Sequence, residues 1–260
     1  MDCNYHAITE VPGLKASREQ LARIYHRYHF AREYAVAKDV LEVACGSGMG
    51  LGYLSRVARL VVGGDIDRRN VELARGIYRD SAVVVREMDA HELPYDQPSF
   101  DLILLFEAIY YLHDPASFVR AAARALRGGG VLIICTVNRD WGDFHPSPYT
   151  HTYFSVPDLY RLLEPVFEEI GLYGAFPVES SGAGSSLFSF IKRMAVHYEL
   201  IPGSLAARAN LKRIFMGPLQ PLPKQVVEGI APYEAPTVID SVRVTADYKI
   251  LYAVAKKGGD

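Results

Sequence analysis

The stretch that decides the fold is Val40-Leu41-Glu42-Val43-Ala44-Cys45-Gly46-Ser47-Gly48-Met49-Gly50. Its apolar first half, residues 40–44, predicts a buried strand, and residues 51–58 have the pattern of a helix. Glycines between a strand and a helix let the backbone approach a ligand closely, because no Cβ intervenes. We therefore predict a ligand-binding turn; the alternative is a tight strand-to-helix turn that binds nothing.

Strand and helix patterns alternate outward from this turn. Short apolar runs predict further strands at 60–64, 82–87, 100–105, 131–137, 169–178 and 248–255, the last of them at an edge of the sheet. Helical patterns lie at 17–36, 68–79, 115–126 and 156–167. Because the strands are almost continuously apolar and alternate with helices, we expect an α/β fold with a parallel sheet covered by helices on both faces.

A long segment separates the last two predicted strands. Residues 179–247 contain six prolines and two helical patterns, at about 187–200 and 205–216. This is too long for an ordinary connection in a compact domain, so we predict a cap or lid within one domain spanning residues 1–260. The pairs Lys192-Arg193 and Lys212-Arg213 suit a phosphate or carboxylate of a substrate, or else lie on solvated helix faces.

The composition limits the classes of partner. Among 260 residues, 22% are charged and the net charge is −2, which favours neither a nucleic acid nor an anionic membrane. The three cysteines form no C-x-x-C pair, so we expect neither a metal site nor a disulfide framework. Because we find no signal peptide and no membrane-spanning run, we expect a cytoplasmic protein, either monomeric or a homodimer.

The glycine spacing distinguishes between two classes of cofactor. Dinucleotide sites use G-x-G-x-x-G, and the residues after Gly50 do not meet the spacing of the third glycine. Glu42, within the strand, would repel a phosphate but could receive an ammonium group. The segment E-V-A-C-G-S-G-M-G resembles motif I of the class I S-adenosylmethionine-dependent methyltransferases, whose usual form is [DE]-x-x-x-G-x-G-x-G.

The resemblance covers residues 17–178, with its elements in the usual order. Further matching segments are V-V-G-G-D-I-D at 61–67, M-D-A-H-E-L-P at 88–94, S-F-D-L-I at 99–103 and the turn L-R-G-G-G at 126–130. The family resemblance implies a seven-stranded, mostly parallel, Rossmann-like sheet with an antiparallel last strand, and the segment 179–247 would be a helical insertion before that strand. It also implies S-adenosyl-L-methionine as cofactor and S-adenosyl-L-homocysteine as product.

The same resemblance assigns cofactor roles to residues at the strand ends. Glu42 would position the methionine part, and Asp89 with Ala90 would meet the adenine edge. Asp65 would bind the ribose hydroxyls, because one carboxylate can accept from two of them; Asp67 would instead cap the next helix. The other candidates of this kind are Ala44, Gly46, Gly48, Ile66, Phe106 and Glu107.

The predicted N-terminal helix, at about 17–37, resembles the helix that closes over the cofactor in many small-molecule members. Arg27 could meet the methionine carboxylate, and the ring of Tyr28 could pack near the sulfonium. The alternative is a surface helix with basic residues that extend into solvent.

These observations predict methyl transfer to oxygen or nitrogen of a small molecule, such as a sugar, a nucleotide-sugar or another biosynthetic intermediate. A general base is needed only for a hydroxyl or a protonated amine, and the candidates are His113, His145 and His151. Two alternatives are open: a nicotinamide-dependent oxidoreductase on the same scaffold, and a module that binds the cofactor without catalysis.

Overall fold

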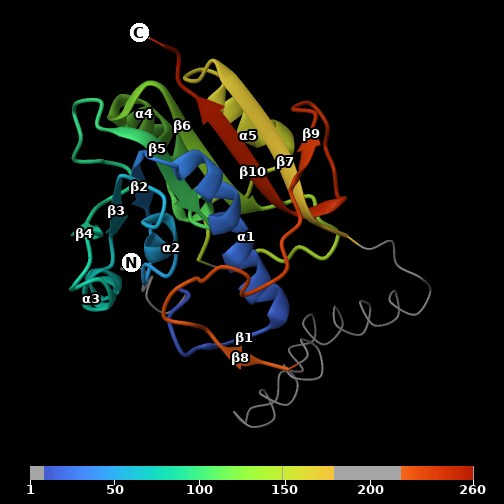
Figure 1. The fold of residues 1–260 in the computed structure, drawn as a ribbon. Coiled ribbons are helices and arrows are strands. Elements are labelled where there is room, and N and C mark those ends of the chain that lie inside the picture. The colour runs from blue at the N-terminus through green and yellow to red at the C-terminus, as the bar shows by residue number, and fades with distance from the viewer. Residues whose placement is uncertain (1–8, 148, 179–217, 260) are drawn as a thin grey trace.

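The computed structural model describes residues 9–147, 149–178 and 218–259, and Figure 1 shows a central sheet with helices packed on it. One core joins the sheet to α1 (Arg18–Ala35), α2 (Leu51–Leu54) and α3 (Arg68–Ile77). A second core joins its other face to α4 (Pro115–Ala125) and α5 (Val156–Leu163). The predicted α/β fold with helices on both faces is confirmed.

The main sheet has eight strands in the order β4-β3-β2-β5-β6-β10-β7-β9. The first five are parallel, whereas β10 is antiparallel to both of its neighbours. The strands are β2 (Asp39–Val43), β3 (Leu60–Asp65), β4 (Val84–Glu87), β5 (Phe100–Phe106), β6 (Leu126–Val137), β7 (Glu169–Pro177), β9 (Thr237–Ile239) and β10 (Tyr248–Lys256). The seven predicted strands are present, and β9 adds an eighth.

The position of the last strand in the sheet differs from the prediction. We predicted 248–255 at an edge of the sheet, but β10 lies between β6 and β7. Its side chains explain this position, because Ile250, Leu251 and Ala253 are buried and contribute to cores on both faces. The edge is instead formed by the short β9, where Val238 is 73% exposed.

The helices begin where the sequence supplies caps and end earlier than predicted. Ser17 and Gln20 form a reciprocal capping box at the start of α1, and Asp67 caps α3. The helix predicted at 51–58 already ends at Leu54, and the one predicted at 156–167 ends at Leu163. No glycine or proline follows Leu54 closely, so the sequence carried no stop signal there, whereas Pro165, two residues after Leu163, is a stop signal that the prediction overlooked.

The conformation of the glycine-rich segment at 126–130 also differs from the prediction. Instead of turning the chain before a strand, it lies within β6 and accompanies a shift in the register between β5 and β6. Gly129 has φ +70°, which glycine adopts without strain. The segment is therefore an irregularity inside a longer strand.

The described part of the predicted insertion, residues 218–247, runs alongside α1 (Figure 1). It forms β8 (Gln220–Pro221), which pairs with β1 (Lys15–Ala16), and Val226 N–H donates to Met49 O over 2.8 Å. Both basic pairs and both helical patterns of the insertion lie outside the described residues. Within the described ranges, no helix is long and apolar enough to cross a membrane.

Candidate active site

A cavity of about 300 Å³ lies where the carboxyl ends of four parallel strands meet. Glu42 comes from β2, Asp65 ends β3, Asp89 follows β4 and Glu107 follows β5. In open α/β sheets, ligands bind at this edge, beside the central strand where the chain reverses its direction of winding. All the predicted cofactor residues line this cavity except Gly48.

The glycine turn after β2 is shaped by packing as well as by the cavity. Gly46 lines the cavity with φ +56°, whereas Gly48, with φ +75°, faces α3. A Cβ on Gly48 would lie 3.0 Å from the Cβ of Ala74. A Cβ on Gly50 would lie 1.9 Å from the ring of Tyr28, so Gly50 lets α1 pack directly on the turn. Only the first glycine of the motif therefore meets the cavity.

Glu42 is buried at the base of the cavity. Its Oε1 accepts a hydrogen bond of 2.7 Å from the Tyr28 hydroxyl, while Oε2 has no partner among the described residues. Burial raises the pKa of the Glu42 carboxyl to about 7, against the opposing effects of the Tyr28 hydrogen bond and Arg27. A buried carboxylate oxygen without a partner is costly, and an ammonium group would satisfy it. The residue thus fits the methionine part of S-adenosylmethionine.

The structure separates the two acids that follow β3. Asp65 lines the cavity and accepts from Gly46 N–H over 2.8 Å and from Asp67 N–H over 2.9 Å, which fixes its carboxylate. The side chain of Asp67 instead accepts from Arg69 N–H as the cap of α3. Ile66, between them, also lines the cavity. Of these two acids, Asp65 is therefore the one that lines the cavity.

The segment after β4 adds a residue that sequence reasoning missed. Asp89 and Ala90 line the cavity, and Asp89 accepts from His91 N–H and lies 2.8 Å from the ring Nδ1 of His91. The other ring nitrogen, Nε2, is buried and has no partner in the described part of the chain. His91 lies two residues after Asp89, inside a motif already quoted, but loop histidines carry no signal that distinguishes them.

Helix α1 forms the opposite wall of the cavity. Arg27 is almost fully buried and its Nη2 donates to the Glu10 carboxylate. The ring of Tyr28 lies edge-on to that of Phe106, with 5.4 Å between the centroids. Arg23 and Gln20 also line the cavity from this helix. The prediction that α1 covers the site on the side of Arg27 and Tyr28 agrees with this placement.

Glu107 lies deep in the cavity, just after β5. Its backbone has φ +51°, an unfavourable value for a residue with a side chain, and N–H donates to Cys135 O. Its Oε2 accepts from the Tyr110 hydroxyl over 2.9 Å. Burial raises the pKa of the Glu107 carboxyl, opposed by Arg27 and by the Tyr110 hydrogen bond. This carboxyl therefore keeps its proton to a higher pH than an exposed one does.

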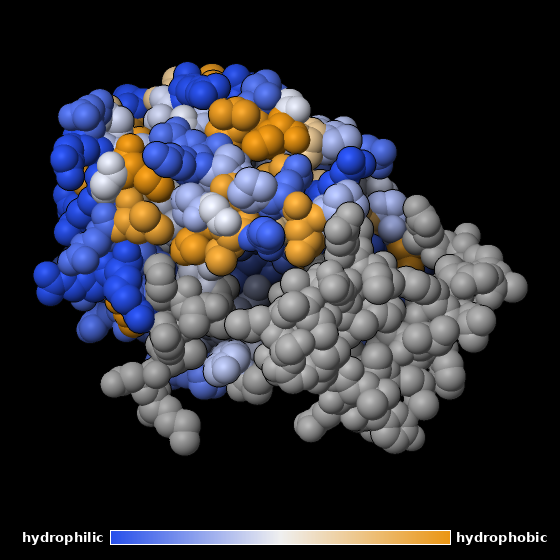
Figure 2. Space-filling view, turned by 90° about the horizontal axis from the view of Figure 1, so that it is seen from below, coloured by the Kyte–Doolittle hydropathy of each residue, from blue (hydrophilic) through white to orange (hydrophobic). Residues whose placement is uncertain are grey.

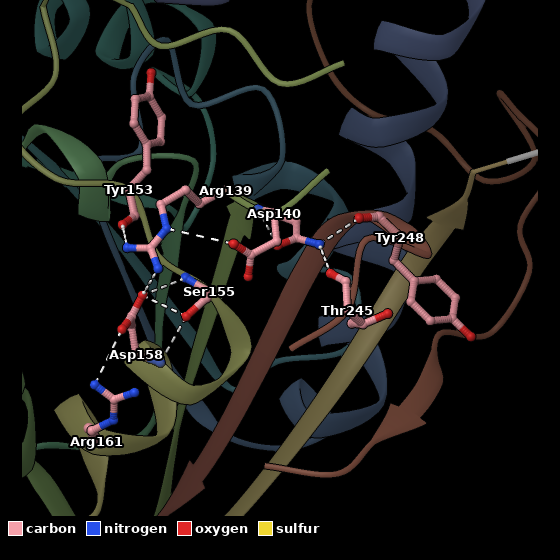
Figure 3. A network of polar contacts seen from close by, with 9 residues as sticks. Arg139, Asp140, Tyr153, Ser155, Asp158, Arg161, Thr245 and Tyr248 are labelled. Carbon is pink, nitrogen blue, oxygen red and sulfur yellow. Dashed lines mark hydrogen bonds and ion pairs between the residues drawn. The ribbon is translucent and has the colours of Figure 1, made fainter. Parts of the chain in front are cut away.

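The three histidines predicted as bases lie outside the cavity lining, and all are exposed. His113 stacks on His91 with 3.9 Å between ring centroids, and His151 N–H donates to Tyr110 O. His145 and His151 belong to a loop anchored by a polar network at its two ends, Arg139 and Ser155 (Figure 3). The roles of these histidines stay predictions, which their placement does not favour.

Two further observations concern metals and surfaces. No group of three or more His, Cys, Asp or Glu side chains in the described ranges is arranged to hold a metal ion. Figure 2 shows apolar residues in small groups separated by hydrophilic ones on the described part of the lower face. The cavity itself gathers acidic, basic and aromatic side chains around one volume.

Comparisons with known proteins agree with the predicted class of enzyme. A family model described as "Methyltransferase domain" matches residues 41–134. A "probable S-adenosylmethionine-dependent methyltransferase" of Mycobacterium tuberculosis is 42% identical over 129 residues, which are 50% of this chain and 46% of that protein. A similarly named protein of Mycolicibacterium smegmatis is 33% identical over 64% of this chain and 66% of its own length. A ubiquinone biosynthesis O-methyltransferase of Chelativorans is 31% identical over 43% of this chain and 47% of that protein.

Solved structures share the fold at low identity. A "possible histamine N-methyltransferase" of Thermotoga maritima has a TM-score of 0.58 and 16% identity, with 92% of this chain and 90% of that chain covered. The [4+2]-cyclase SpnF also has a TM-score of 0.58, with 17% identity, and 99% of this chain and 91% of that chain are covered. One fold therefore carries different reactions, so the reaction must be argued from the site.

The layered fold, the strand order and the cavity at the strand ends define a Rossmann-like α/β protein. Residues 41–134 match the methyltransferase family model, and the fold is that of the class I S-adenosylmethionine-dependent methyltransferases. The family implies S-adenosylmethionine as cofactor. The chain spans about half to two thirds of the length of the curated relatives named above.

Proposed function

We propose that this protein transfers a methyl group from S-adenosylmethionine to an oxygen or nitrogen of a small molecule. The observation that carries this proposal is the placement of three acids, Glu42, Asp65 and Asp89, at successive strand ends around one cavity. In this proposal Glu42 receives the cofactor's ammonium group and Asp65 its ribose hydroxyls. Asp89 and Ala90 meet the adenine edge.

S-Adenosylmethionine, when bound, supplies a methyl group that its sulfonium already activates toward displacement. The protein then has to hold the acceptor in line and exclude water, and good orientation can contribute about 7–11 kcal/mol. In the proposed arrangement Tyr28 and Phe106 provide aromatic surface around the reacting groups. Arg27 binds a carboxylate, which fixes the position of the methionine part.

A hydroxyl acceptor must lose a proton during transfer, and we propose Glu107 as the group that receives it. Glu107 lines the cavity, and the Tyr110 hydroxyl holds one of its oxygens. Its raised pKa improves the match between the carboxylate and a hydroxyl proton. The acceptor oxygen would attack the methyl carbon as its proton moves to Glu107, and the carbon–sulfur electron pair would return to sulfur.

The lining favours a hydroxylated ring as the acceptor. Tyr110, Tyr111 and Phe106 give the cavity an aromatic side, on which a flat molecule can pack. The similarity to ubiquinone biosynthesis O-methyltransferases supports a small hydroxyl acceptor as well. A sugar or nucleotide-sugar is the second candidate, and it is favoured by the basic pairs at 192–193 and 212–213.

Calorimetry with S-adenosylmethionine, S-adenosylhomocysteine and NADH tests the cofactor class. We expect both sulfur ligands to bind with a Kd on the order of micromolar and NADH to show no heat of binding. Binding of NADH alone would identify an oxidoreductase instead. Release of S-adenosylhomocysteine in the presence of catechols, phenols or sugars then tests turnover. Cofactor binding with no turnover on any acceptor would support the non-catalytic module.

A further inference from the structure

The segment just before β1 lines the cavity beside the glycine turn. Thr9 and Glu10 line the cavity, and the Ser47 hydroxyl donates to the main-chain oxygen of Glu10 over 2.8 Å. Asn70 Nδ2 donates to Thr9 Oγ1 over 3.1 Å, and Gly13 N–H donates to Leu222 O over 2.9 Å. The main chain of this segment is therefore fixed in place by residues of the turn, α3 and the loop beside β8.

The side chain of Glu10 makes a separate contact, with Arg27. Its carboxylate accepts a hydrogen bond from Arg27, whose side chain is 8% exposed, whereas the side chain of Glu10 is 40% exposed. Burial of a guanidinium without a counter-charge is strongly unfavourable, so Arg27 needs an anion beside it. In this structure the chain itself supplies that anion.

We propose that Glu10 occupies the carboxylate subsite of the cofactor pocket, and that the carboxylate of S-adenosylmethionine displaces it from Arg27. This inference rests on the proposed function. The two ligands present the same chemical group to the same guanidinium. Glu42 and Glu107 also face this cavity, so a second carboxylate on Arg27 would add to an already negative site.

The exchange needs only a rotation of one side chain. The contacts that anchor the segment use the main-chain oxygen of Glu10 and the hydroxyl of Thr9, so they persist when the Glu10 carboxylate leaves. The partial exposure of Glu10 gives this carboxylate a route to water. In addition, Arg27 Nε has no partner among the described residues, which leaves it available to the second oxygen of an incoming carboxylate.

The consequence is a built-in competition that lowers the affinity for the cofactor. While Glu10 holds Arg27, the pocket cannot bind the cofactor's carboxylate there. A binding-competent state that is only partly populated weakens the apparent affinity in proportion. In return, Arg27 keeps a counter-charge when no cofactor is bound, and the helix wall stays in place. The competition acts only on ligands that carry a carboxylate.

The test compares S-adenosylmethionine with its decarboxylated form, which lacks only the carboxylate. We expect Glu10→Gln to tighten binding of S-adenosylmethionine about 10-fold in calorimetry and to leave the decarboxylated form within about 2-fold. Glu33→Gln is the matched control, since it removes one exposed carboxylate from α1 outside the cavity lining. It should change neither affinity.

The outcomes separate this inference from the proposed function. If wild-type protein binds S-adenosylmethionine and Glu10→Gln leaves its affinity unchanged, the competition is overturned while the cofactor assignment stands. Weaker binding by Glu10→Gln would also overturn it, because Glu10 would then be positioning Arg27 for the cofactor. If wild-type protein binds neither form, the proposed function fails and this inference fails with it.

Discussion

The two walls of the cavity are built in different ways. The strand-end wall carries Glu42, Asp65 and Asp89 on segments whose backbones are held by the parallel sheet or follow it directly. The helix wall consists of α1 with Thr9 and Glu10, and contacts between side chains hold it against the sheet. One wall is fixed by the backbone ladder, and the other by apolar side chains of α1 in the shared core together with hydrogen bonds from individual residues.

This difference suggests that the two walls have different functions. Residues on the ends of paired strands keep their positions through the cooperative sheet, so they suit contacts that define the ligand. A helix held by side chains can loosen when a single group changes its charge or partner. We therefore expect changes in the strand-end wall to act on cofactor affinity and most changes in the helix wall to act on stability and pH dependence.

The largest effect should follow from Asp65→Ala, in the strand-end wall. Loss of a charge-assisted acceptor for two ribose hydroxyls should weaken S-adenosylhomocysteine binding about 100-fold in calorimetry. Asp67→Ala is the control two residues away; it removes the cap of α3 and should cost about 1 kcal/mol of stability with unchanged affinity. Equal affinity losses in both variants would show that the strand-end acids act through structure alone.

A smaller effect is expected from His26, which holds α1 against β10. The Glu234 carbonyl can only accept, so His26 Nε2 carries the hydrogen and Nδ1 accepts from the Tyr252 hydroxyl over 2.7 Å. Burial lowers the pKa of His26 to about 4, despite the opposing hydrogen bond to Glu234. The folded state therefore favours the neutral ring.

The lowered pKa fixes the direction of the pH dependence. The unfolded chain binds a proton at pH values below about 6.5, and the folded one does so only near pH 4, so stability is present above pH 6.5 and is lost as the pH falls. Between pH 7 and pH 5 this loss should be about 2 kcal/mol in urea unfolding. His26→Gln should remove that part of the loss, and the exposed His145→Gln should keep it. The same acid loss in all three proteins would contradict the assignment.

The strand-end wall could be predicted from the sequence, because each acid follows an apolar run and parallel strands end at one edge. The helix wall was partly predictable: Arg27 and Tyr28 stand in a helical pattern, and the resemblance assigned them to the cofactor. Glu10 and His91 were missed, since their place depends on contacts between segments and no local pattern marks them.

The fold, too, could be predicted from the sequence only in part. Strand positions follow from apolar runs, but the position of β10 between β6 and β7 depends on long-range pairing that periodicity does not encode. Gly48 was assigned to the cavity with the rest of its motif, although it packs on α3. A motif gives the residue types that meet a ligand, whereas packing decides which member of the motif does so.

Tyr28 joins the two walls, so Tyr28→Phe should have an intermediate effect. Without the hydroxyl, Glu42 loses its one hydrogen bond, and we expect S-adenosylmethionine to bind about 10-fold more weakly. The loss should be larger at pH 6 than at pH 8, because the hydrogen bond lowers the pKa of Glu42 from a value that burial raises, and the ammonium prefers the ionised form. Tyr34→Phe, on the same helix outside the cavity lining, should show neither change. A pH-independent loss would place Tyr28 in contact with the cofactor instead of acting through Glu42.

The smallest effect is expected at Glu228, which ties the described part of the insertion to the outer side of α1. Its carboxylate accepts from the Tyr25 hydroxyl over 2.6 Å and from the Tyr53 hydroxyl over 2.8 Å, and these bonds lower the pKa of Glu228. The site is half exposed, so Glu228→Gln should cost no more than about 1 kcal/mol of unfolding free energy. Hydrogen exchange of residues 224–230 should quicken, with cofactor affinity unchanged within about 2-fold.

Glu234→Gln keeps the main-chain oxygen that His26 binds and should change neither quantity. A large loss of cofactor affinity in Glu228→Gln would mean that this contact sets the position of the helix wall, and the distinction between the two walls would no longer hold.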